Sequence, residues 1–126
     1  MMTIAKIVIY GNPATKKNSS RIIRAGNYMR LIPSKKYVDY EKLARKYMPK
    51  IETINKPINL KCVYYRADKR RVDLVNLLEA TCDVLVKYKV LEDDNYKIIK
   101  SHDGSRVCFD KENPRVEIFI EDFKNI

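Results

Sequence analysis

The sequence has few of the residues that histidine, zinc and glycine-loop chemistry require. Its 126 residues include one histidine, His102, three glycines and three cysteines. One histidine argues against histidine-based nucleophilic triads and multi-histidine metal sites, and three scattered glycines leave no phosphate-binding glycine loop. The cysteines are odd in number, widely spaced and form no Cys-x-x-Cys pair, so we expect reduced core residues and no zinc site. Chemistry in this chain must therefore use carboxylates and lysines.

Long apolar runs are also missing. No stretch approaches the roughly 18 apolar residues of a transmembrane helix, so no membrane span is expected. The N-terminal MMTIAKIVIYG predicts a strand and lacks the apolar region and cleavage site of a signal peptide, which favours an intracellular protein. The length, with 45% hydrophobic and 33% charged residues, predicts a single globular domain over residues 1–126.

Acids are scarce in the first part of the chain, which leaves its positive charge unbalanced. The formal net charge is +10, and residues 1–50 hold 12 lysines and arginines against Asp39 and Glu41. Such a surface favours a polyphosphate partner, nucleic acid in particular, and an acidic membrane face is the alternative. Lys16 and Lys17, in the loop after the first expected strand, suit either phosphate contacts or an ordinary solvated loop.

Hydrophobic periodicity predicts an α+β domain with a mixed, mostly antiparallel sheet and two principal helices. The expected strands lie at 3–10, at 21–32 as a short pair, at 58–67 and at 115–122, and the expected helices lie at 35–48 and 73–88. Residues 96–109 contain strand-like runs, counted as one strand in the order of elements, with a turn or bulge expected at Gly104 beside Asp103 and Ser105. Ser34 is the expected N-cap of the first helix. Tyr37, Tyr40 and Tyr47 recur in it at helical spacing and suit either the core or base stacking.

Acids gather in one segment, KRRVDLVNLLEATCDVLVKYKVLEDDN. On a helix with about 100° per residue, Asn76, Glu79 and Asp83 fall within a band of roughly 60° on one side of Asp73. Leucines and valines, among them Val75, occupy the rest and predict a mostly buried helix with an acidic edge. Confined carboxylates repel one another unless a cation lies among them, and oxygen ligands of this kind suit Mg²⁺ or Mn²⁺.

Each of these acids also has an ordinary interpretation. Asp73 could be only a helix N-cap, Glu79 and Asp83 a solvated helix edge, and Asp93 with Asp94 an acidic loop. Their concentration between arginine and lysine residues favours a metal site over these alternatives.

The segment DLVNLLEATCDVL, followed by LEDDN, resembles the RusA-type crossover junction endodeoxyribonucleases of bacteria and their phages. That family carries R-R-x-D-x-D-N-L-x-K, a downstream Asp-x-Leu and then an Asp-Asp pair. The matching residues here are Arg70, Arg71, Asp73, Asn76, Leu77, Asp83, Leu85, Asp93 and Asp94. The opening GNPATKKNS is similar to the family's N-terminal strand and loop.

The resemblance implies a RusA-like fold and a Mg²⁺-dependent homodimer that introduces paired nicks into four-way (Holliday) DNA junctions. It also implies that the protein works in the cytoplasm of a bacterial host, with branched DNA as partner and no membrane. The family's metal-binding carboxylates correspond to Asp73 and Asp94. Little base readout is expected, because a junction is recognised by its shape.

Two positions depart from the family pattern: Val75 stands where the family has its second Asp, and Glu79 stands where it has a Lys. We predict that Glu79, about one helical turn from position 75, replaces the missing ligand. The expected catalytic residues are Asp73, Glu79 and Asp94, with Asp83 and Asp93 as further metal ligands and Asn76 in support. The expected DNA contacts are Lys16, Lys17, Arg21, Lys69, Arg70 and Arg71. The alternative is a degraded metal site in a protein that only binds branched DNA.

Overall fold

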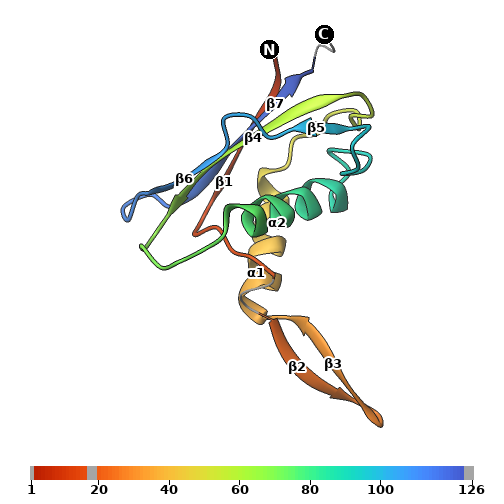
Figure 1. Ribbon diagram of the computed structural model, residues 1–126, viewed down its shortest axis with the longest axis vertical. Coiled ribbons are helices and arrows are strands. Elements are labelled where there is room, and N and C mark those ends of the chain that lie inside the picture. Colours follow the sequence, from red (N-terminus) through yellow and green to blue (C-terminus); the bar gives the residue numbers. More distant parts are fainter. Residues whose placement is uncertain (1, 17–19, 124–126) are drawn as a thin grey trace.

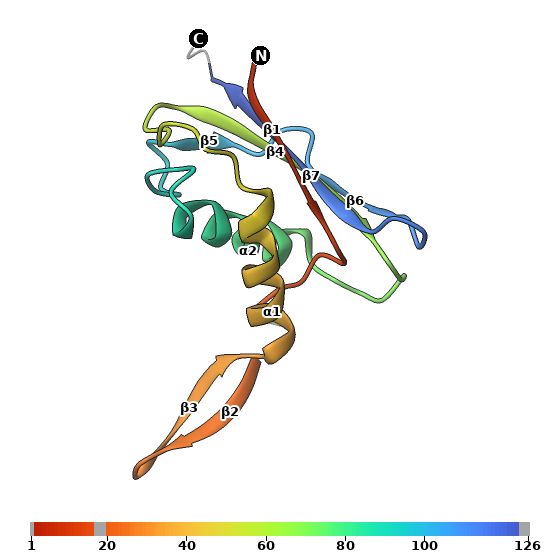
Figure 2. The same ribbon diagram turned by 180° about the vertical axis from the view of Figure 1, so that it is seen from behind.

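The computed structural model describes residues 2–16 and 20–123. In chain order the elements are β1 (Thr3–Tyr10), β2 (Ser20–Ala25), β3 (Tyr28–Pro33), α1 (Lys35–Ala44), the 3₁₀ helix η2 (Arg45–Tyr47), β4 (Ile58–Arg66), α2 (Leu74–Lys87), β5 (Ile99–Ser101), β6 (Arg106–Phe109) and β7 (Arg115–Asp122). Figures 1 and 2 show α1 and α2 on the same side of the main sheet, with the β2–β3 hairpin projecting beyond α1 and away from that sheet.

The main sheet is mixed and mostly antiparallel, as the sequence predicts. β7 lies between β1 and β4 and pairs antiparallel with both. The other edge of β4 carries two short parallel strands, β5 beside its start and β6 beside its end. The turn predicted at Gly104 is confirmed, and it divides residues 96–109 into two strands, β5 and β6, where the predicted order of elements counts one. Gly104 makes this turn possible with a φ of +86°, a conformation that favours glycine.

The core lies between the sheet and the two helices. Ile7 of β1, Ile118 of β7 and Cys62 of β4 stand side by side in the sheet register, and all three are buried. Leu77 and Leu85 belong to the same buried cluster and place one side of α2 in this core. The apolar residues occupy alternate positions in β1 and β7, which is why the predicted strand bounds there are confirmed.

The first helix ends earlier than predicted. Ser34 caps α1, accepting a hydrogen bond from the backbone N–H of Tyr37 at 3.3 Å, as the sequence predicts. The α-helix stops at Ala44, however, and a 3₁₀ turn replaces the rest of the expected 35–48 helix. Met48 is extended because the residue before a proline avoids the helical conformation. Tyr37 and Tyr40 are buried, so the core interpretation of these tyrosines is confirmed.

The second helix has the predicted bounds to within one residue, with Asp73 at its N-cap position and Tyr88 at its C-cap. The prediction for Val75 is wrong: this side chain is 70% exposed instead of widening the buried side. At about 100° per residue Val75 lies only about 40° from Glu79 around the helix axis, so it shares the outward side with that acid. The hydrophobicity of Val75 therefore did not predict whether its side chain faces the core or the solvent.

The remaining predictions about cysteines and membranes can also be compared with the structure. All three cysteines are free thiols; Cys62 and Cys82 are buried, whereas Cys108 is only half-buried. Within residues 2–16 and 20–123, no helix is both long enough and apolar enough to cross a membrane.

Candidate functional site

Asp73 stands at the start of α2 without acting as a conventional side-chain cap. It occupies the N-cap position with an extended backbone, but its carboxylate accepts no hydrogen bond from the helix N–H groups. Instead the Asn76 side-chain amide donates to Oδ2 of Asp73 at 3.4 Å. The N-cap interpretation is therefore right for the backbone of Asp73 and wrong for its carboxylate, which the Asn76 side chain contacts instead.

Glu79 and Val75 face the same side of α2. Both are exposed, and they are four residues apart, which brings their side chains next to each other on a helix surface. The helix rise places Glu79 about 9 Å from Asp73 and about 6 Å from Asp83 along the axis, while Asp73 and Asp83 are about 15 Å apart. Asp73 and Asp83 therefore cannot hold the same ion, and Glu79 is the acid between them.

Asp83 and Asp94 lie on different segments but act on each other electrostatically. Partial burial raises the pKa of Asp94, and the carboxylates of Asp93 and Asp83 raise it further. Asp83 is half-buried and forms an ion pair with Lys16, whose Nζ lies 2.8 Å from Oδ2 of Asp83. Lys16 thus brings a cation from the loop after β1 to the acidic edge of α2.

The pKa of the buried Cys82 thiol responds to three of the predicted site acids. Burial is the main cause that raises its pKa to about 12, and the charges of Asp94, Asp83 and Glu79 raise it as well. Three carboxylates from α2 and the following loop therefore act on one thiol. Asp73 is not among the acids that shift the pKa of Cys82, in agreement with its position at the other end of the helix.

Asp93 and Asp94 are adjacent in sequence but differ in their surroundings. The carboxylate of Asp93 accepts hydrogen bonds from the backbone N–H of Asp94 at 2.7 Å and from the Asn95 amide at 3.0 Å. These bonds lower the pKa of Asp93, in contrast to the raised pKa of Asp94. The Asp93 carboxylate is thus engaged in shaping the loop, and Asp94 is the acid whose charge is poorly compensated.

The donor chemistry of these acids fits a hard divalent cation. Carboxylate oxygens are the ligands that Mg²⁺ and Mn²⁺ prefer, and the repulsion at Asp94 would be relieved by a positive ion. In the described part of the chain, however, no three acid, histidine or cysteine side chains come close enough together to hold a metal ion. The described residues therefore supply separate acids rather than a complete triad.

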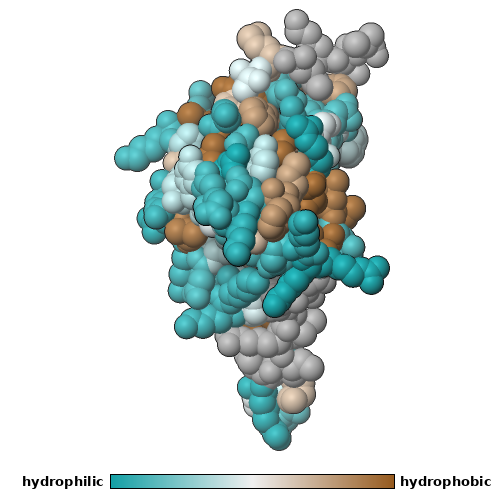
Figure 3. Space-filling model, turned by 90° about the vertical axis from the view of Figure 1, so that its left-hand side faces the viewer, coloured by the Kyte–Doolittle hydropathy of each residue, from teal (hydrophilic) through white to brown (hydrophobic). Residues whose placement is uncertain are grey.

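The predicted DNA contacts fall in three different situations. Lys69, Arg70 and Arg71 lie in the exposed connection between β4 and α2, and Nζ of Lys69 lies 5.0 Å from the centre of the Phe109 ring. Lys16 is paired with Asp83, as described above. Lys17 lies outside the described residues, and the side chain of Arg21, in β2, is not described either. Figure 3 shows the side on which β6 lies in Figure 1, and hydrophilic residues cover most of this face.

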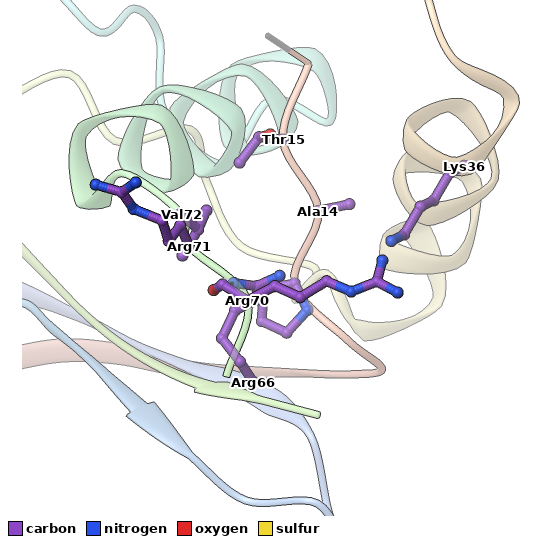
Figure 4. Close-up of a pocket in the computed structure, with 8 residues that line it drawn as sticks. Ala14, Thr15, Lys36, Arg66, Arg70, Arg71 and Val72 are labelled. Atoms are coloured by element: carbon purple, nitrogen blue, oxygen red, sulfur yellow. Dashed lines mark hydrogen bonds between the residues drawn. The ribbon is translucent and has the colours of Figure 1, made fainter. Parts of the chain in front are cut away.

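Two cations that sequence reasoning missed, Lys36 and Arg66, lie beside Arg70 and Arg71. These four residues line a cavity of about 160 Å³ together with Pro13, Ala14, Thr15 and Val72 (Figure 4). A signal for Arg66 was present in the sequence. It continues the alternate positions of β4 that point into the core, so strand periodicity places this arginine on the buried side.

A basic α+β domain with carboxylates along one helix and cations at the start of that helix has the composition of a protein that acts on nucleic acid. Residues 11–121 match the family described as endodeoxyribonuclease RusA, and the chain belongs to this family. Membership implies an endonuclease that resolves DNA junctions. None of the curated proteins matches the chain.

Proposed function

We propose that the protein is a Mg²⁺-dependent endonuclease, with Mn²⁺ as a possible substitute, that resolves four-way or other branched DNA junctions by paired phosphodiester hydrolysis. The observation that supports the metal-dependent part is the electrostatic setting of Asp94. Partial burial, the carboxylate of Asp93 and, to a smaller extent, that of Asp83 raise the pKa of Asp94, in a protein with a net charge of +10. Carboxylates with perturbed pKa values are typical of functional sites.

Asp73, Glu79 and Asp94 are the proposed catalytic residues, with Asp83 and Asp93 as further ligands. Glu79 has a longer side chain than the aspartates and lies between Asp73 and Asp83 along α2. It is therefore the acid that could share a bound ion with either of them. A divalent ion bound by such carboxylates would supply Lewis-acid and water-activating chemistry for phosphodiester hydrolysis. Asn76 would hold the orientation of the Asp73 carboxylate through their 3.4 Å contact. Lys16 would limit repulsion at Asp83.

Cations around the acidic edge would hold the negatively charged DNA that the carboxylates alone repel. Lys69, Arg70 and Arg71 come just before Asp73 in sequence, so backbone phosphates bound there would bring DNA to the start of α2. We also propose a homodimer, because two sites related by two-fold symmetry suit paired cuts in a branched substrate.

The first test incubates the protein with a synthetic four-way junction, with and without Mg²⁺ or Mn²⁺. We expect symmetric nicks only when a divalent ion is present. The Asp94→Asn variant should lose cutting and keep junction binding, whereas Asp39→Asn, which removes the charge of an exposed acid on α1, should cut normally. Cutting by the Asp94→Asn variant at the unaltered rate would refute the assignment of Asp94.

The role of Glu79 has its own test. The Glu79→Gln variant should cut much more slowly, and full activity would discard the idea that Glu79 replaces the family's second Asp. The double variant Val75→Asp/Glu79→Lys restores the family pattern at both positions. Because Val75 is 70% exposed, the new Asp would be tolerated without loss of core packing, and we expect activity to return.

A second candidate function is structure-selective DNA binding without cleavage. The observation in its favour is that no three potential metal ligands converge among the residues described. Junction binding at low concentration together with no cutting in Mg²⁺ or Mn²⁺ would support this alternative over the nuclease.

A further inference from the structure

The cavity near the start of α2 has unusually cationic walls. We call it the arginine pocket and define it by Lys36, Arg66, Arg70 and Arg71, which line it together with the loop after β1. Its volume of about 160 Å³ is sufficient for a phosphate group. Of the residues described that line it, none is acidic. Three separate parts of the chain thus bring positive charge to one small space (Figure 4).

Arg66 is the most informative wall residue, because it is buried. The residue is only 8% exposed, and its Nε has no hydrogen-bond partner in the structure. Its Nη1 donates to the backbone oxygen of Arg70 at 3.3 Å, and its Nη2 lies 4.0 Å from Oδ1 of Asp68. A buried guanidinium with an unsatisfied N–H is unfavourable, and buried polar groups nearly always have a partner. A ligand that accepts hydrogen bonds would supply one.

Lys36 and Arg70 indicate independently that the pocket accommodates an anion. Figure 4 shows the Arg70 side chain extending across the pocket toward Lys36 of α1, so that their charged ends point toward each other. Two like charges that converge repel each other unless an anion lies between them. The carboxylate of Asp68 acts on these cations: it accepts a hydrogen bond from the backbone N–H of Arg70 at 2.9 Å, and this bond and the charges of Arg66, Arg70 and Lys36 lower its pKa. One carboxylate against these three cations leaves the pocket with a positive excess.

We propose that the arginine pocket binds one phosphate group of the DNA backbone, at a position separate from the acids proposed to hold the metal ion. Guanidinium groups match phosphate oxygens in geometry and charge, and Arg66, Arg70 and Lys36 approach from different walls. Only the identity of the ligand as DNA rests on the proposed nuclease function. The pocket would fix the strand before it reaches Asp73, which follows Arg70 by three residues.

The test uses exposed wall residues, because replacing the buried Arg66 could prevent folding. Lys36→Gln and Arg70→Gln are compared with Lys35→Gln, which removes the same charge from the neighbouring exposed position of α1 but does not line the pocket. Binding of a four-way junction is measured without divalent ions over a range of salt concentrations. Loss of one phosphate contact lowers the slope of log K against log salt by about 0.9. We expect this loss for Lys36→Gln and Arg70→Gln and not for Lys35→Gln.

Inorganic phosphate provides a second, DNA-independent measurement. Phosphate should shift the amide NMR signals of Arg66 and Arg70 in the unaltered protein and in Lys35→Gln, and the double variant Lys36→Gln/Arg70→Gln should lose these shifts. Equal salt slopes for the Lys35 and Lys36 variants, or phosphate shifts that persist in the double variant, would overturn the proposal.

The two proposals can fail separately. If the junction is never cut but the salt slopes differ as expected, the arginine pocket stands and the nuclease proposal falls. If the junction is cut normally and the Lys36→Gln slope is unaltered, the nuclease proposal stands and the pocket is not a phosphate site.

Discussion

Replacing Asp94 by Asn should increase the thermal stability of the protein while removing its cleavage activity. Partial burial and the neighbouring carboxylates of Asp93 and Asp83 raise the pKa of Asp94, so its ionised form is less favourable in the folded chain than in the unfolded chain. Asn has nearly the same shape and no charge. The substitution therefore removes the repulsion and, under the proposed function, also removes a metal ligand.

The size of the gain is limited by solvent, because Asp94 is exposed. Interactions between exposed charges contribute at most about 1 kcal/mol, so we expect a few tenths to about 1 kcal/mol at neutral pH. For a chain of this size that corresponds to a rise in Tm of about 1–4 °C. The folded-state pKa of Asp94 lies above the unfolded value of about 3.9, so the cost of ionisation exists above the folded pKa. The difference in Tm should therefore disappear near pH 3, where the carboxyl is protonated in both states.

Asp93→Asn is the matched control, since it removes the same charge from the adjacent residue. Hydrogen bonds lower the pKa of Asp93, so its ionised form stabilises the folded chain above the unfolded pKa, and this contribution is lost as the pH falls through the folded pKa. Asp93→Asn should therefore lower Tm at neutral pH, opposite in sign to Asp94→Asn.

The assay is differential scanning calorimetry between pH 3 and pH 8, with and without Mg²⁺. Mg²⁺ should raise the Tm of the unaltered protein, because a ligand that binds only the folded state stabilises it, and should have little effect on Asp94→Asn. A lower Tm for Asp94→Asn at neutral pH would show that Asp94 is not under repulsion. An equal response of both proteins to Mg²⁺ would refute its role as a ligand.

Three further substitutions test the account of the fold by urea denaturation. Gly11→Ala should lower the free energy of unfolding by about 1–3 kcal/mol, because Gly11 has a φ of +120° and an added Cβ would lie 3.1 Å from Cδ2 of Leu43. An unchanged urea midpoint would contradict this. Ser34→Ala should lower the free energy of unfolding by about 1 kcal/mol, because the N-cap hydrogen bond of α1 is lost, and Ser34→Thr should retain most of the stability of the unaltered protein. Tyr64→Phe should lower the free energy of unfolding by about 1 kcal/mol, since it removes the 2.6 Å hydrogen bond to the buried Thr81 hydroxyl, which keeps only its bond to the backbone oxygen of Leu77; an unchanged midpoint would contradict this.

The elements that the sequence predicted well are those with a regular hydrophobic period. β1 and α2 match their predicted ranges to within one residue, because alternate or helical spacing of buried residues depends only on the local chain. The errors occur where a special conformation interrupts the pattern, such as the number of strands around the Gly104 turn and the early end of α1 before Pro49. Val75 was misplaced because helical angle and hydropathy gave opposite indications for it.

The sequence by itself determined the kinds of element, the acids along one side of α2 and the family to which the chain belongs. All of these depend on spacing within one segment, which covalent geometry fixes. Only the tertiary structure decided which charges meet. It brings Lys16 to Asp83, it puts Asp94 within electrostatic reach of the same carboxylate, and it makes Arg66 part of the wall of the arginine pocket. Such meetings depend on how distant segments pack over the shared core, and no periodicity within one segment encodes them.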